Sequence, residues 1–267
     1  RAAQAACDGS ATLKGAEQLV NMLARKADER LRARGANASD AARVDADRAG
    51  AGALLDEAEN LVQKLIAIAP TAERYSLLGS VLKRRLPLVD DNVLDQALQA
   101  IEQAYQCAEQ RVGDCRERLY YPALNVLQTT LLRQLLGTLS DAERDSARSR
   151  IDAVRAEVEG AGFQPRDLWD KVAKVDLALT ETLLTLAWGG PQSSAADKDF
   201  KTVQEAYLSV LEHASQRERA SVQSTPQTLL TFLVRLQPRL KGPGAKRGTD
   251  LIKRLQQLCD ALRGPQK

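Results

Sequence analysis

Apolar side chains recur at intervals of three and four residues along most of the chain, and such runs end near a proline or a glycine. Leu54, Leu61, Leu65 and Ile68 form one stripe, which stops before Pro70. This spacing places the side chains on one face of an α-helix. No run alternates with the two-residue period of a β-strand. Helices are predicted over residues 11–34, 54–68, 71–87, 93–108, 120–136, 140–158, 165–188, 197–214, 224–240 and 248–262.

The composition favours the same structural class. Only 4% of the residues are aromatic, and Ala, Leu, Gln, Arg and Glu dominate. These side chains suit helices, whereas strands favour aromatic and β-branched residues. Ser140 and Glu143 also have the spacing of a capping box at a helix start. We therefore predict an all-α fold.

Nothing at the N-terminus of this sequence resembles a signal peptide, because no apolar core precedes a small-residue cleavage site. The chain begins at Arg1 and its only methionine is Met22, so we expect a piece of a longer protein. The longest apolar run, Leu177–Trp188, contains Glu181 and three threonines and falls short of a membrane span. A soluble, cytoplasmic protein that does not associate with membranes is expected.

Short connections between successive helices predict antiparallel helical hairpins. Hairpin starts near residues 71, 117, 165 and 217 give a period of about 46 to 52 residues. Residues 101–105 (IEQAY) and 203–207 (VQEAY) echo one another on the second helices of two hairpins. Such periodicity predicts a superhelical array of hairpins, a tetratricopeptide-like α-solenoid.

Two regions are expected along the chain. Residues 34–52 are rich in Ala, Gly and Asp and contain almost no large apolar side chain, which favours a mobile connection or a loosely held helix. Residues 1–52 would then form an N-terminal helix with this connection, and residues 53–263 the helical-repeat domain.

The residues needed for catalysis or metal binding are scarce. His213 is the only histidine, no Ser/His/Asp or Cys/His arrangement is evident, and no phosphate-binding glycine loop occurs. The cysteines Cys7, Cys107, Cys115 and Cys259 do not have zinc-site spacing, and reduced thiols are favoured over a Cys107–Cys115 bridge. A protein that is not an enzyme and uses no cofactor or metal is predicted.

The net charge of +3 disfavours nucleic acid as a partner. Its distribution is uneven, because residues 235–267 contain nine basic residues and only Asp250 and Asp260 as acids. A solvated helix face is the favoured interpretation of this segment, with an acidic partner or a phosphate as the alternative.

One segment resembles a tetratricopeptide repeat. Tyr75, Leu78, Gly79 and Leu82 follow the spacing of the first helix of such a repeat, in which the glycine lets the paired helix approach closely. The hairpins predicted from this sequence are longer than those of that repeat, so the match is one of general architecture.

A tighter resemblance covers roughly residues 50–240. Residues 73–85 (ERYSLLGSVLKRR), 120–125 (YYPALN) and 167–176 (DLWDKVAKVD) are similar to motifs of the tetratricopeptide-like sensor domain, TPR-S. That family occurs beside protease-like and other effector domains of bacterial conflict systems, and a related helical region lies in animal apoptosis signal-regulating kinases. The resemblance implies recognition of a small ligand, for example one derived from a nucleotide, or of a partner, and control of an effector domain in the same or a neighbouring polypeptide.

A candidate ligand site combines cations, an aromatic ring and an amide on the first helices of two successive hairpins. Its members are Arg74, Ser80, Lys83, Arg84, Tyr121 and Asn125. Arginine and lysine suit a small anionic ligand, tyrosine offers a stacking face, and asparagine both donates and accepts hydrogen bonds.

Several alternatives remain open for these residues. Tyr121 could pack in the core, Asn125 could bond the backbone, and residues 83–85 could be a solvated run. Trp169 and Trp188 are expected in the core. A scaffold that holds a peptide or a neighbouring domain in a concave groove is the alternative function.

Overall fold

The computed structural model describes residues 12–33, 41–112, 119–160, 163–165, 167–189 and 194–263. These residues form helices and connections without a strand, which confirms the all-α class and the helical array. The α-helices are α2 (Leu13–Ala33), α3 (Ala41–Ile68), α4 (Ala72–Arg85), α5 (Leu94–Glu109), α6 (Tyr120–Leu136), α7 (Asp141–Glu159), α8 (Leu168–Ala187), α9 (Ser194–Val210), α10 (Gln216–Leu236) and α11 (Gly242–Arg263). Short 3₁₀ turns occupy Leu86–Leu88, Asp91–Val93 and Gln237–Arg239.

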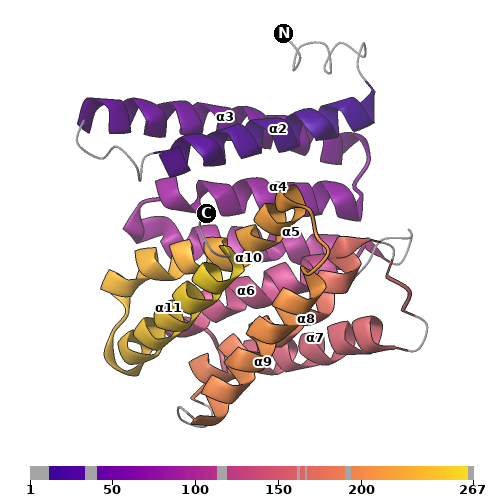
Figure 1. Cartoon of the computed structure of the whole chain (residues 1–267). Helices are drawn as coiled ribbons and strands as arrows, with labels where there is room; N and C mark the ends of the chain where they lie inside the picture. The colour runs from indigo at the N-terminus through magenta and orange to yellow at the C-terminus, as the bar shows by residue number, and fades with distance from the viewer. Residues whose placement is uncertain are drawn as a thin grey trace. The chain divides into compact units, whose positions relative to one another are not determined.

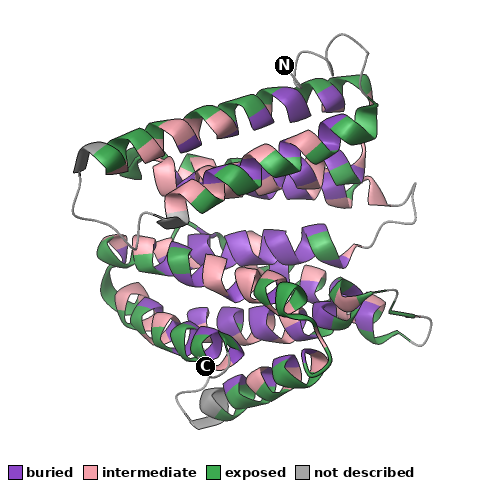
Figure 2. Cartoon of the chain, turned by 45° about the horizontal axis from the view of Figure 1, so that its top comes forward, coloured by how far each residue is buried: buried purple, intermediate pink, exposed green. Residues whose placement is uncertain are grey.

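The helices divide into two compact units (Figure 1). Unit 1 comprises α2 to α5 within residues 1–118, and unit 2 comprises α6 to α11 within residues 119–267. Figure 2 shows that most helices are buried along one side and exposed along the other. This pattern is what the apolar stripes predict.

In unit 1, α2 packs against α3, α3 against α4, and α4 against α5. The cluster shared by α2, α3 and α4 is built largely from alanine, leucine and valine. Its buried members include Val20, Leu55, Val62 and Val81. Successive hairpins thus bury their apolar faces against their neighbours.

The N-terminal region differs from the prediction. Helix α3 runs without interruption from Ala41 to Ile68, through the boundary that the sequence placed after residue 52. Ala51 and Ala58 are fully buried in the core against Ala24 and Ala27 of α2. Alanine is the best helix former and lets two helices approach closely, so this core needs few large side chains. Residues 34–40 lie outside the described residues.

The two echoed motifs occupy equivalent places in their hairpins. Tyr105 on α5 and Tyr207 on α9 are both fully buried, on the second helices of the α4–α5 and α8–α9 pairs. The Tyr105 ring lies against Gly79 on α4. The Tyr207 hydroxyl instead donates a hydrogen bond to Asp176 on α8. Burial, with the nearby Asp176 charge, raises the pKa of Tyr207 well above its ordinary value of 10.0.

Helix α6 is the centre of unit 2, where it packs against α7, α8, α10 and α11. Its N-terminus lacks a capping side chain of its own. The Glu157 carboxylate on α7 accepts the backbone N–H groups of Leu119 (3.2 Å) and Tyr120 (2.8 Å) instead. The Tyr120 hydroxyl donates to the buried carboxylate of Asp170 on α8 at 2.8 Å. Three helices are therefore joined at the start of α6.

The last two helices begin earlier than predicted. Helix α10 starts at Gln216 and continues through Pro226, at the cost of one backbone hydrogen bond. The capping box of Ser215 and Glu218 fixes its start. Helix α11 starts at Gly242, inside the predicted connection 241–247, because Pro243 suits a first helical turn, where its missing N–H leaves no bond unmade.

We expect the Glu143→Gln variant to lose about 1 kcal/mol of stability at neutral pH and nothing at low pH. The predicted capping box is present, and Arg133 Nη1 lies 2.7 Å from Glu143 Oε1. Burial alone would raise the pKa of Glu143, but the bonds from Ser140 and Arg133 lower it below 4.5. A carboxyl group whose pKa is lowered in the folded state adds stability at pH values above its unfolded-state pKa. This stability is lost as the pH falls through the folded-state pKa. Urea unfolding of both proteins at pH 7 and pH 3 measures the difference, and an equal deficit at both values would contradict it.

Candidate functional site

Arg74 lies inside unit 1 rather than on a ligand-facing surface. The residue is 5% exposed, and its Nε donates to Glu17 Oε1 on α2 at 2.8 Å. Its Nη1 donates to the carbonyl oxygens of Leu65 (3.0 Å) and Ala69 (2.7 Å) at the end of α3. The guanidinium thus joins α2, α3 and α4, and the structure gives it a structural role in place of the predicted ligand contact.

Ser80 and Arg84 do lie together on α4. Arg84 Nη1 donates to the Ser80 carbonyl oxygen at 3.1 Å and also to the Ser80 hydroxyl. Lys83 Nζ lies 6.0 Å from the centre of the Tyr105 ring, at the limit of a cation–π contact. All three predicted residues are half-buried, so they are not a fully solvated run.

Tyr121 and Asn125 belong to unit 2, at the start of α6. Asn125 is buried and its Nδ2 donates to the Tyr121 carbonyl oxygen at 2.8 Å. This is the backbone-satisfying role that the sequence left open. The Tyr121 side chain is 46% exposed and is therefore not a core residue.

The predicted set is thus divided between the two units. Within unit 1 the structure brings Ser80 and Arg84 together, while Arg74 points toward α2 and the end of α3. Within unit 2 it brings Tyr121 and Asn125 together through the backbone.

Sequence reasoning missed one cation beside α4. The Arg111 guanidinium carbon, past the end of α5, lies 4.4 Å from the centre of the Tyr75 ring. Arg111 Nη1 also donates to the Cys107 carbonyl oxygen at 2.8 Å. Tyr75 belongs to the predicted tetratricopeptide pattern, but Arg111 is 36 residues away along the chain and no local pattern pairs them. Tyr75, Lys83, Arg84 and Arg111 all belong to the α4–α5 hairpin and its C-terminal end and are half-buried, and together they are named here the α4–α5 cationic site.

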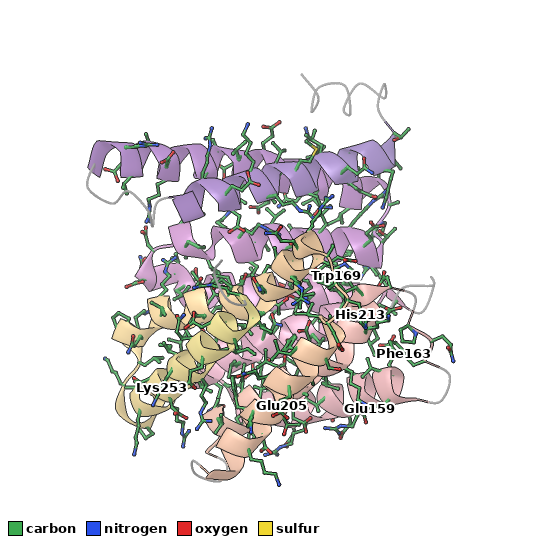
Figure 3. All side chains as sticks on the ribbon, viewed as in Figure 1. Glu159, Phe163, Trp169, Glu205, His213 and Lys253 are labelled. Carbon is green, nitrogen blue, oxygen red and sulfur yellow. The ribbon has the colours of Figure 1, made fainter. Side chains whose placement is uncertain are left out.

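The two tryptophans differ from the core positions expected of them. Trp169, labelled in Figure 3, is 44% exposed near the start of α8. The next residue, Asp170, faces the interior, which turns Trp169 outward on the helix. Trp188 is half-buried, with the Arg148 guanidinium carbon 5.4 Å from its ring.

Groups with potential reactivity are dispersed. His213 is exposed after α9, as a solvated histidine would be (Figure 3). Cys107 is a free thiol, and its candidate partner Cys115 lies outside the described residues. Cys259 is buried and free, and burial raises the pKa of its thiol to about 11. Within the described ranges, no group of three or more His, Cys, Asp or Glu side chains could hold a metal ion.

No helix in the described part of the chain is long and apolar enough to cross a membrane. The apolar helices α6 and α8 both contain polar threonines. Their apolar residues are packed inside unit 2.

Comparison with known proteins agrees with the resemblance found in the sequence. No curated protein and no solved structure matches the chain significantly. A family model described as Tetratricopeptide Repeats-Sensor matches residues 2–157. This range includes the described helices of unit 1, helix α6 and most of helix α7. The match covers more than half of the chain and spans the α4–α5 cationic site. The chain therefore belongs to the Tetratricopeptide Repeats-Sensor family.

Proposed function

We infer that this chain is a non-catalytic sensor domain that binds a small anionic ligand and controls a linked effector in bacterial defence. The family match over residues 2–157 is the observation that carries this proposal. The family's description names a sensor built from tetratricopeptide repeats. The ligand, the effector and the defence role come from the resemblance, and a nucleotide-binding measurement tests the ligand.

The α4–α5 cationic site supports an anionic ligand. Lys83, Arg84 and Arg111 bring three positive charges to one helical hairpin, where the guanidinium of Arg84 donates to Ser80 and that of Arg111 to the Cys107 carbonyl oxygen. By contrast, Arg85 on the same helix pairs with Asp56 at 2.7 Å and Glu59 at 3.0 Å. The Tyr75 ring adds an aromatic surface that already stacks on a guanidinium, so a planar, negatively charged molecule such as a nucleotide fits this chemistry.

Ligand binding would act on the packing between hairpins. In helical arrays each hairpin contacts mainly its neighbours, so a ligand that binds one arrangement better shifts the equilibrium toward it. Gly79 and Tyr105 lie in contact between α4 and α5, which places the candidate site on a close helix–helix junction. An effector that contacts either helix would sense that shift.

A protein scaffold is the second candidate function. Exposed Tyr121 is the observation that favours it, because tyrosine is enriched at the centres of protein interfaces. A stoichiometric protein partner whose binding is unaffected by nucleotides would replace the ligand sensor with this scaffold.

A nucleotide that binds the site should raise the melting temperature of the purified chain. At about 100 times its dissociation constant a ligand adds about 2.7 kcal/mol, a shift of a few degrees for a chain of this size. We expect the shift to vanish in the Lys83→Ala/Arg111→Ala variant and to persist in Lys26→Ala, which removes an exposed charge from α2. Each variant is compared with its own ligand-free melting temperature. Equal shifts in all three proteins would contradict the proposed site.

A further inference from the structure

The segment 219–249 contains six basic residues and no acidic one. It lies in unit 2, beyond the residues that match the family model, and it covers most of α10, the turn Gln237–Arg239 and the start of α11. The basic residues are Arg219, Arg235, Arg239, Lys241, Lys246 and Arg247. The last five, within thirteen positions around the turn that joins α10 to α11 in Figure 1, are named here the basic corner.

Residues 219–249 supply no acidic side chain to offset the positive charge of this corner. Lys241 and Lys246 are exposed. Arg247 Nη1 donates a hydrogen bond to the Ala187 carbonyl oxygen at 2.8 Å, and this neutral partner does not cancel the charge of the guanidinium. The first acid after the corner is Asp250, whose Oδ2 already pairs with Arg254 Nε at 2.9 Å. An excess of one sign on a surface attracts partners of the opposite sign.

The geometry of the turn holds these cations near one helix end. Gln237 Nε2 lies 3.5 Å from Thr249 Oγ1, and Gly248 is packed so closely that an added Cβ would lie 2.2 Å from Leu240 Cδ1. The turn therefore folds back on the first turns of α11. The N-terminal end of that helix carries a partial positive charge that adds to the side chains.

An apolar residue of the same segment is exposed. Val234, next to Arg235 near the end of α10, is 48% exposed. Protein interfaces combine such an apolar anchor with surrounding charges that set specificity. A nucleic acid is less suited, because single strands need exposed aromatic rings and the segment's one aromatic residue, Phe232, is buried.

We propose that the basic corner is a docking surface for an acidic protein segment that carries an apolar side chain between its carboxylates. Carboxylates contact Arg239, Lys241 and Lys246, and the apolar side chain contacts Val234. This goes beyond the proposed ligand sensor, because it uses other residues, another unit and another class of partner. A docking surface of this kind would suit an acidic segment of the linked effector or of a regulator.

The test uses the full chain and two labelled synthetic peptides, one rich in glutamate with a single central leucine and one with glycine in its place. We expect the Arg239→Gln/Lys241→Gln/Lys246→Gln variant to bind the leucine peptide about tenfold more weakly at low salt. The matched control Lys26→Gln/Lys171→Gln/Lys198→Gln removes the same charge from exposed sites elsewhere and should bind as the wild type does. Lys241→Gln/Lys246→Gln, which alters exposed side chains only, should lose a smaller part of the affinity.

The Val234→Ser variant separates the apolar contact from the charges. We expect it to weaken binding of the leucine peptide severalfold and to leave the glycine peptide unchanged. Equal losses for both peptides, or a charge variant that binds as the wild type does, would overturn the proposal. So would tighter binding of a single-stranded oligonucleotide than of the leucine peptide. None of these results depends on the nucleotide-induced change in melting temperature, so the two proposals can fail separately.

Discussion

The Arg74→Met variant is expected to lose about 3 kcal/mol of unfolding free energy, because it removes the buried partner of Glu17 and leaves that carboxylate only the exposed Lys14, whose Nζ lies 3.4 Å from Glu17 Oε2. Both side chains of the pair are more than nine-tenths buried. The substitution also removes donors from the carbonyl oxygens of Leu65 and Ala69. Urea unfolding followed by circular dichroism measures the loss. A deficit below about 1 kcal/mol would show that the pair is not buried in solution.

Lys14 supplies the matched control for Arg74. Its Nζ lies 2.6 Å from Glu73 Oε1 and 3.4 Å from Glu17 Oε2, but the ammonium group is exposed and Arg74 still binds Glu17, so Lys14→Met should cost no more than about 1 kcal/mol. The double variant Glu17→Leu/Arg74→Met should recover much of the loss, because it removes both buried charges together. A stability defect in Arg74 variants would mimic loss of ligand response, so Lys83 and Arg111 are the better probes of the sensor site.

The Gly79→Ala variant is expected to destabilise the chain by about 2–3 kcal/mol. An alanine Cβ at this position would lie 2.6 Å from the nearest atom of the fully buried Tyr105 ring, so one of the two helices must move. Alanine's higher helix propensity offsets about 1 kcal/mol at most. The midpoint of urea unfolding reports the change.

Gly52→Ala is the contrasting substitution on α3. The added Cβ would lie 3.9 Å from Leu88 Cδ1, an ordinary contact, so the variant should gain about 0.5–1 kcal/mol. The Gly79→Ala/Tyr105→Leu double variant should be less destabilised than the two single losses combined, because both act on one contact. If Gly79→Ala stabilised the chain as Gly52→Ala does, the close α4–α5 contact would be absent.

Helical periodicity was sufficient to predict most of the fold. The helices α4 to α9 begin and end close to the predicted positions because breakers and capping residues mark them locally, as at Ser140 and Gly137. The errors in the predicted helix boundaries came from proline, glycine and alanine, because each of these residue types occurs in more than one structural role. Pro226 lies within a helix, the glycines of residues 242–248 lie in the first turns of one, and alanines before residue 53 build a core without large side chains.

The candidate site was less predictable, because a side chain's role depends on partners far away in sequence. Arg74 lies on the same helix as Lys83 and Arg84, and only the position of Glu17, 57 residues earlier, shows that it points inward. Arg111 was missed for the same reason, since its contact with Tyr75 crosses a hairpin. Whether Trp169 faces the interior or the solvent likewise depends on which face of α8 is buried, and that face carries Asp170.

The start of α6 has a consequence for the order in which the chain can fold during synthesis. Its first amides bond to Glu157 and its first tyrosine to Asp170, which the ribosome adds 37 and 50 residues after Tyr120. Helix α6 is therefore synthesised before the groups that complete its N-terminus. All the helices that pack in unit 1, α2 to α5, are synthesised before α6. In unit 2 the bonds at the N-terminus of the central helix α6 cannot all form until α8 is made. Translation thus favours folding of the half that carries the α4–α5 cationic site before the half that carries the basic corner.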